Sequence, residues 1–149
     1  VHLFPVTGEH KHFVPGDRPA VCQTPWGILG VITCFDLRFP ELARAEAKKG
    51  AVILAVCAQW PAARKAHWDL LLRARAVENQ CFVIGANRCG IEGKTTFPGR
   101  SAVISPMGRV LARAGSRGTR LFATLDMKEL TAFRKSMPCL ELGVSEAYR

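Results

Sequence analysis

The stretch GVITCFDLRFPEL, residues 30–42, places a thiol where an apolar run ends and a charged turn begins. Cys34 follows the run directly, and Asp36 and Arg38, which we expect to brace the turn, come next. In α/β proteins reactive groups collect at the carboxyl ends of strands, and a sharp strand-to-helix turn exposes a nucleophile beside backbone N–H groups. From its position alone, Cys34 is either a nucleophile or one more buried apolar thiol.

The elements that must position Cys34 follow from apolar runs and helix signals. Continuous apolar runs predict buried strands at 28–34, 51–58 and 81–86. Helices are predicted at 40–49, 62–80 and 127–135, the last with Asp126 as its N-cap. A short strand at 19–24, a hairpin at 101–104 and 109–112 and a strand at 120–125 complete the pattern, with loops at 5–18 and 87–100. Strands that alternate with helices predict an α/β fold.

Composition narrows the function classes. The net charge of +9 favours anionic partners, but the basic residues are scattered and no basic run is interleaved with aromatic residues, so we expect no nucleic-acid partner. Salt-sensitive retention of DNA or RNA would be the sign of that alternative. No apolar run has membrane-spanning length, so we expect no membrane association. Cys22, Cys57 and Cys81 lie in apolar runs and are expected to be buried, which favours a reducing, cytoplasmic location.

CFDLRFPEL resembles the nucleophile motif of the nitrilase, or carbon-nitrogen hydrolase, superfamily. The resemblance continues in VHLF with GEHKHFVPGD, in residues 56–90, which resemble the omega-amidase-like branch, and in PGRSAVISPMGRVLARAG. It implies an α/β fold of the nitrilase-like α-β-β-α sandwich type, incomplete here at the N-terminus. Residues 1–149 are then the C-terminal part of one carbon-nitrogen hydrolase domain.

The resemblance also implies a catalytic Glu-Lys-Cys set that needs no metal and no organic cofactor. Cys34 matches the nucleophile, and the backbone N–H of Phe35 matches the oxyanion donor. The matching lysine falls immediately before Val1 and the general-base glutamate farther upstream. We therefore expect the parent protein to be an amidase, and this chain alone to be inactive.

Three further residues are candidates for the site. The resemblance implies that Glu9 is a supporting active-site carboxylate, with a surface loop residue as the alternative. It implies that Trp60 lines the acyl pocket, with a core tryptophan at the sheet edge as the alternative. Arg88 follows the third buried run and could bind a substrate carboxylate, because arginine recognises carboxylates in bidentate fashion, although a solvated loop arginine explains it equally.

The function implied for the parent protein is hydrolysis of a linear amide, an omega-amide of a dicarboxylate such as 2-oxoglutaramate or succinamate, to acid and ammonia. The partners implied are this small-molecule amide and further copies of the chain, in a homodimer or higher homo-oligomer with helix 62–80 as an interface candidate. The alternative is a truncated, non-catalytic homologue that acts as a binding or interaction protein.

Overall fold

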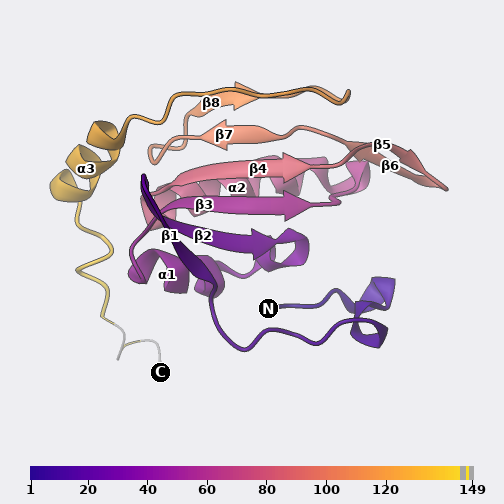
Figure 1. Cartoon of the computed structure of the whole chain (residues 1–149), viewed down its shortest axis with the longest axis horizontal. Helices are drawn as coiled ribbons and strands as arrows, with labels where there is room; N and C mark the ends of the chain where they lie inside the picture. Colours follow the sequence, from indigo (N-terminus) through magenta and orange to yellow (C-terminus); the bar gives the residue numbers. More distant parts are fainter. Residues whose placement is uncertain (145–146, 148–149) are drawn as a thin grey trace.

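The computed structural model describes residues 1–144 and 147, and its centre is a six-stranded sheet with the order β1-β2-β3-β4-β7-β8 (Figure 1). The strands are β1 (Val21–Thr24), β2 (Gly27–Thr33), β3 (Ala51–Ala58), β4 (Phe82–Asn87), β7 (Ala102–Ile104) and β8 (Val110–Arg113). β2, β3 and β4 are parallel, and the other neighbouring pairs are antiparallel. The predicted α/β fold is confirmed.

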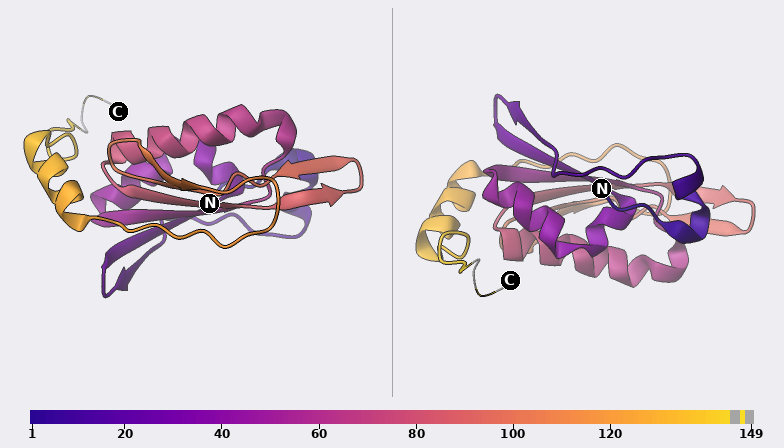
Figure 2. Two further views of the ribbon diagram at one scale, coloured as in Figure 1. Left: turned by 90° about the horizontal axis from the view of Figure 1, so that it is seen from above. Right: turned by 90° about the horizontal axis from the view of Figure 1, so that it is seen from below.

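Two helices connect the parallel strands, as parallel neighbours require. α1 (Pro40–Lys48) links β2 to β3, and α2 (Lys65–Asn79) links β3 to β4. Both lie on the same face of the sheet (Figure 2), while α3 (Met127–Ser136) follows β8 with Asp126 as its N-cap. The carboxyl ends of β2, β3 and β4 therefore meet at one edge of the sheet, where Cys34, Gln59 and Arg88 follow the strands.

The core lies between this sheet and α1 and α2. Trp68 and Leu72 of α2 are buried and reach the sheet at Gly85. A Cβ at Gly85 would lie 2.7 Å from Leu72 Cδ1 and 2.9 Å from the Trp68 ring, so only glycine permits this contact. None of the helices among the described residues combines the length and apolarity needed to cross a bilayer.

Two secondary-structure predictions are wrong. Residues 87–100, predicted as a loop, contain a separate hairpin of β5 (Cys89–Glu92) and β6 (Thr95–Pro98), which projects beyond the end of β4 (Figure 1). The turn between its strands has only two residues and uses a glycine with φ +55°, Gly93. Residues 120–125, predicted as a strand, pair with no strand in the part of the chain that the structure describes.

The prediction of buried cysteines is correct for Cys81 and wrong for Cys22 and Cys57, which are exposed. The reason is the alternation of side chains along a strand. In β3, Val56 faces the helices and is fully buried, whereas Cys57 faces the opposite side of the sheet, which α1 and α2 do not cover. An apolar run alone does not tell which of its residues lie under a helix layer.

Glu46 on α1 is a buried carboxyl group, and its burial disfavours the ionised form. It has no exposed surface and packs against Gly30 of β2, and the backbone N–H of Ala20 offsets only part of the cost of burying its charge. Burial raises the pKa of Glu46 from 4.5 to about 7. Because the pKa is raised in the folded state, the protonated Glu46 side chain destabilises nothing below pH 4.5. The free energy of unfolding then falls as the pH rises through about 7 and the buried side chain ionises.

We therefore predict that Glu46→Gln removes this pH dependence. Relative to the unmodified protein, the free energy of unfolding of the variant should increase by about 3 kcal/mol in total as the pH rises from 4.5 to about 7. Urea unfolding at pH 5 and pH 8 measures the difference. Glu41→Gln, at an exposed position of the same helix, is the control and should show no such trend. If the free energies of unfolding of Glu46→Gln and the unmodified protein differ by the same amount at pH 5 and pH 8, the prediction is wrong.

Candidate active site

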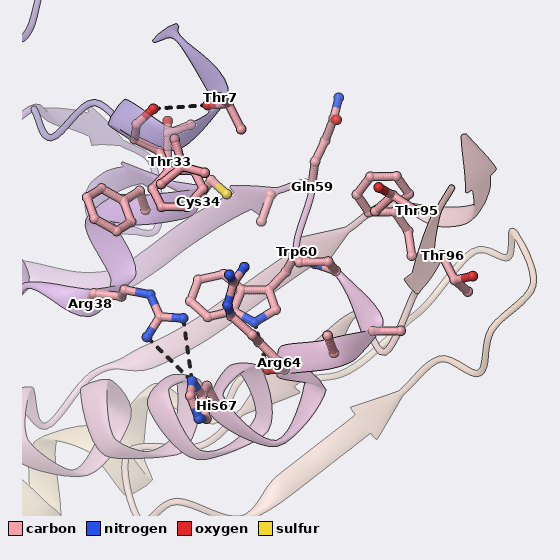
Figure 3. Close-up of a pocket in the computed structure, with 18 of the residues that line it drawn as sticks. Thr7, Thr33, Cys34, Arg38, Gln59, Trp60, Arg64, His67, Thr95 and Thr96 are labelled. Carbon is pink, nitrogen blue, oxygen red and sulfur yellow. Dashed lines mark hydrogen bonds between the residues drawn. The ribbon is translucent and has the colours of Figure 1, made fainter. Parts of the chain in front are cut away.

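The chain turns sharply where β2 ends. Thr33 is still extended, whereas Cys34 has φ +43°, in the left-handed region that residues other than glycine rarely adopt. Cys34 also begins the short 3₁₀ helix Cys34–Arg38. Figure 3 shows its sulfur projecting from the strand end toward Gln59. The sharp turn that the sequence predicts after this strand is present, and it leaves the thiol half-buried.

Asp36, which is 4% exposed, holds this turn in place. Its carboxylate accepts a hydrogen bond from the Thr33 N–H at 3.1 Å, and the Thr33 side chain accepts from the Asp36 N–H in return. The His2 N–H and Nδ1 lie 2.7 and 2.9 Å from the other carboxylate oxygen. Burial alone would raise the pKa of Asp36, but the hydrogen bonds from His2 and Thr33 lower it overall.

A cavity of about 1380 Å³ opens beside Cys34 (Figure 3). Its walls come from the N-terminal segment, the turn after β2, the end of β3 with the following loop, α2 and the β5–β6 hairpin. Of the predicted site residues, Glu9, Cys34, Phe35 and Trp60 all line this cavity. Arg88 does not.

The surroundings of Cys34 keep its thiol protonated. Burial raises the pKa of Cys34, the backbone N–H of Gln59 opposes this effect, and the negative charges of Glu9 and Asp36 add to it. Arg38 acts in the opposite direction. A thiol with a raised pKa needs a proton acceptor before it can act as a nucleophile.

Glu9 belongs to the 3₁₀ helix Glu9–Lys11, inside the segment predicted as a loop. Its Oε2 accepts a hydrogen bond from the Phe4 N–H at 2.7 Å, which ties the segment around the carboxylate. The sequence places Glu9 and Cys34 25 positions apart, and the fold brings both to one cavity.

Trp60 is only 3% exposed, and Asn87 holds its backbone. The Trp60 N–H donates to Asn87 Oδ1 at 2.7 Å, and Asn87 Nδ2 donates to the carbonyls of Trp60 and Gly99 at 3.2 and 2.8 Å. Sequence reasoning missed Asn87. The available signal was its place as the first polar residue after the third apolar run, at the carboxyl end of a parallel strand.

The guanidinium groups at the cavity are those of Arg38 and Arg64, not that of Arg88. Arg88 pairs with Glu92 of the hairpin and stacks on Phe97, with 4.8 Å between its guanidinium carbon and the ring centroid. Arg38 lies over the Trp60 ring at 4.6 Å from the centroid, and its Nη2 is 3.4 Å from Nδ1 of His67.

Sequence reasoning gave Arg38 only a bracing role and did not consider Arg64, whose backbone carbonyl accepts a hydrogen bond from Trp60 Nε1 at 2.8 Å. The described residues contain no group of three His, Cys, Asp or Glu side chains that could hold a metal ion.

Comparison with known proteins places this geometry in a family. The chain is 38% identical over 140 residues to the 2-oxoglutaramate amidase of Bacillus subtilis, and this match covers 94% of the chain and 54% of the relative. The crystal structure of a carbon-nitrogen hydrolase from Helicobacter pylori superposes with a TM-score of 0.90 at 29% identity and covers 99% of this chain and 57% of that one.

A third similar protein is the E41Q mutant of an amidase from Nesterenkonia sp. AN1. Its structure carries the acetamide moiety of fluoroacetamide, covalently added at the active-site cysteine. The TM-score is 0.82 at 32% identity, with 95% of this chain and 51% of that one covered. The chain thus spans about half the length of the relatives that it matches.

The carbon-nitrogen hydrolase family model matches residues 1–135, which include Cys34, Trp60 and every strand of the sheet. The chain therefore belongs to the carbon-nitrogen hydrolase family.

Proposed function

We propose that the protein containing this chain hydrolyses a linear amide, with Cys34 as the nucleophile. The observation that carries the proposal is the left-handed turn that presents the Cys34 thiol at the wall of a large cavity. Two relatives support it, the 2-oxoglutaramate amidase and the amidase with a covalent adduct at its active-site cysteine.

In the proposed reaction the Cys34 sulfur attacks the amide carbonyl and gives up its proton to a base. The tetrahedral oxyanion is stabilised by the N–H of Phe35, which lies in the first turn of the 3₁₀ helix, where N–H groups have no partner within the helix. Ammonia leaves with an added proton, and a thioester remains. Water then attacks the thioester, which releases the carboxylic acid and restores the thiol.

We propose that the lysine and the general-base glutamate come from residues upstream of Val1 in the complete protein. The raised pKa of Cys34 supports the need for such a base. The backbone nitrogen of Val1 lies 3.2 Å from Asp36 Oδ2, so the residue before Val1 would lie close to the turn that carries Cys34. In this proposal Glu9 orients the nucleophile or the substrate from the cavity wall.

The proposed substrate is an omega-amide of a dicarboxylate, such as 2-oxoglutaramate or succinamate. Its far carboxylate needs a cation inside the cavity. Arg38 supplies one, because Trp60 and His67 hold its guanidinium at the wall and no carboxylate pairs with it among the described residues. Arg38 thus takes the place that the sequence suggested for Arg88.

The complete protein is also proposed to be a cytoplasmic homo-oligomer. All six cysteines are free in the structure, which is typical of a reducing compartment. Leu70 and Val77, seven residues apart on α2, are 67% and 45% exposed and give this helix an apolar stripe suited to an interface.

The proposal predicts ammonia release by the full-length protein from 2-oxoglutaramate and succinamate. Butyramide, which lacks the far carboxylate, should be hydrolysed with a kcat/KM lower by about 10- to 100-fold, because it forgoes a charge-assisted hydrogen bond to Arg38. An assay of released ammonia measures both. If the fully reduced protein releases no ammonia from any of the three amides, the proposal is wrong and a non-catalytic binding role takes its place.

A further inference from the structure

Two hydrogen bonds and one ring contact tie His2 to the turn that carries Cys34. The backbone N–H and the Nδ1 of His2 lie 2.7 and 2.9 Å from the same carboxylate oxygen of Asp36. The His2 ring lies flat on the Phe39 ring, with 3.6 Å between the centroids and 5° between the planes. Asp36 lies in the first turn of the 3₁₀ helix that Cys34 begins, and Phe39 follows its last residue. His2 therefore contacts this helix at both of its ends.

The direction of the side-chain hydrogen bond follows from the charge of Asp36. Burial would raise the pKa of this carboxyl, but the hydrogen bonds from His2 and Thr33 lower it overall, so near neutral pH the group is ionised and only accepts. Nδ1 of His2 therefore carries a proton and donates it to the carboxylate. A hydrogen bond to an ionised acceptor is roughly twice as strong as one between neutral groups, so it holds the His2 ring in one orientation.

The same N-terminal segment contacts two further residues of the site through Phe4. The Phe4 ring packs on the Phe35 ring with 4.9 Å between the centroids, and the Phe4 N–H donates to Glu9 Oε2 at 2.7 Å. Phe35 carries the proposed oxyanion donor, and Glu9 is the carboxylate proposed to orient the nucleophile or the substrate. Residues 1–4 thus join the turn after β2 to the 3₁₀ helix of Glu9.

His2 takes part in this arrangement without facing the reaction. Phe4 lines the cavity, whereas His2 does not, and its ring is directed at Asp36 and Phe39. Its contacts fix where residues 1–4 lie relative to the turn. Because the proposed lysine enters from directly upstream of Val1, a shift of this segment also shifts that lysine relative to Cys34.

We propose that His2 is a positioning residue, whose hydrogen bond to Asp36 holds the chain around Val1 in register with the turn that carries Cys34. The inference rests on the proposed amidase function and adds a link between two segments of the same site. A displacement of a catalytic group by about 1 Å can lower the rate by about 100-fold, so a register contact of this kind affects turnover strongly.

The experiment compares His2→Leu and His2→Asn in the full-length protein. Both variants lose the ring that stacks on Phe39, but only asparagine keeps an N–H one bond from Cγ, where His2 has Nδ1. His2→Leu should lower kcat for succinamate by about 10- to 100-fold and leave KM within a few-fold, because the displaced lysine acts on the transition state. His2→Asn should keep kcat within a few-fold of the unmodified protein.

Two further variants support the comparison. His2→Ala also lacks the donor and should show the same loss of kcat as His2→Leu, which guards against a folding defect peculiar to leucine. His12→Leu is the matched control, because His12 is an exposed histidine of the N-terminal region outside the cavity lining. This replacement should leave kcat and KM unchanged.

The outcomes separate positioning from packing. If His2 only packs against Phe39, His2→Leu and His2→Asn lose the same contact, and kcat falls equally in both. An equal fall, or a kcat that His2→Leu leaves unchanged, overturns the inference while the amidase function stands. A rise in KM at constant kcat also overturns it, because the effect would then be on substrate binding.

If no amide is hydrolysed, amide hydrogen exchange read by mass spectrometry decides instead. In His2→Leu, the peptides that contain residues 1–4 and 33–39 should both exchange faster than in the unmodified protein, because one hydrogen bond holds both segments. His2→Asn should exchange as the unmodified protein does. Faster exchange of residues 1–4 alone would overturn the inference, since the N-terminal segment would then not be coupled to the turn.

Discussion

Replacing Cys34 by alanine is expected to abolish ammonia release by the full-length protein while leaving its fold intact. If the sulfur forms the thioester, no other group in the cavity replaces it at the same turn, and kcat should fall by about 10⁴-fold or more. The loss of a half-buried thiol should cost at most about 1 kcal/mol of stability, because the removed volume is small and alanine keeps the same backbone. Ammonia assays and thermal unfolding of the same preparation measure the two effects.

Cys57 provides the matched control for this experiment. It lines the same cavity and is exposed, and its backbone pairs with that of Thr33, the residue before Cys34, yet it lies within a regular strand and not on the left-handed turn. Cys57→Ala should therefore keep turnover within a few-fold of the unmodified protein. If Cys57→Ala loses activity and Cys34→Ala keeps it, the nucleophile has been assigned to the wrong thiol.

The parts of the fold that were predictable from the sequence are those whose signals are local. The buried strand at 51–58 was predicted with the bounds that β3 has, because both of its ends are marked, by Gly50 before it and by a polar residue and proline after it. Helix 127–135 was predictable because Asp126 caps it, and its side chain does accept the Lys128 N–H. Whether a segment pairs with a neighbouring strand depends on residues far away in the sequence. Residues 120–125 have a strand-like composition but no such partner among the described residues, and for this reason they were predicted wrongly.

The candidate site likewise has one part that local signals predict and another that depends on tertiary contacts. The turn at Cys34 was visible because apolar and charged residues meet there, and the end of a parallel strand is a place with chemical meaning. Its order after a strand made Arg88 a candidate for binding a substrate carboxylate, with a solvated loop arginine as an equal alternative. The fold pairs Arg88 with Glu92 and brings Arg38 over Trp60, 22 positions away along the chain. Which arginine faces a cavity depends on such tertiary contacts, and no spacing in the sequence reports them.

Asp36→Asn is expected to have the largest effect on the turn itself. In the unmodified protein both carboxylate oxygens only accept hydrogen bonds, from the N–H groups of Thr33 and His2 among others. An asparagine of the same shape must turn its NH₂ group toward one of these donors, which leaves a buried N–H without an acceptor. We expect the free energy of unfolding to fall by about 2–3 kcal/mol, and kcat to fall because the left-handed conformation of Cys34 loses its support.

The pH dependence of this loss distinguishes it from a general packing defect. The pKa of Asp36 is lowered in the folded state, so its carboxylate contributes stability above the unfolded value of 3.8, and the contribution is lost as the pH falls through the folded-state pKa. The difference in the free energy of unfolding between the unmodified protein and Asp36→Asn should therefore be largest above pH 4 and become smaller in acid.

Asp17→Asn is the matched control for Asp36→Asn. The Asp17 side chain is 84% exposed, and its ion pair is with the neighbouring Arg18. This replacement should change the free energy of unfolding by less than about 0.5 kcal/mol at any pH. Urea unfolding from pH 3 to pH 8 measures both variants. A gap for Asp36→Asn that is independent of pH would mean that the carboxylate charge does not hold the turn. A gap that narrows in acid while kcat stays unchanged would mean that the turn keeps its shape without Asp36, and that the strain at Cys34 is maintained by the sheet and α1 alone.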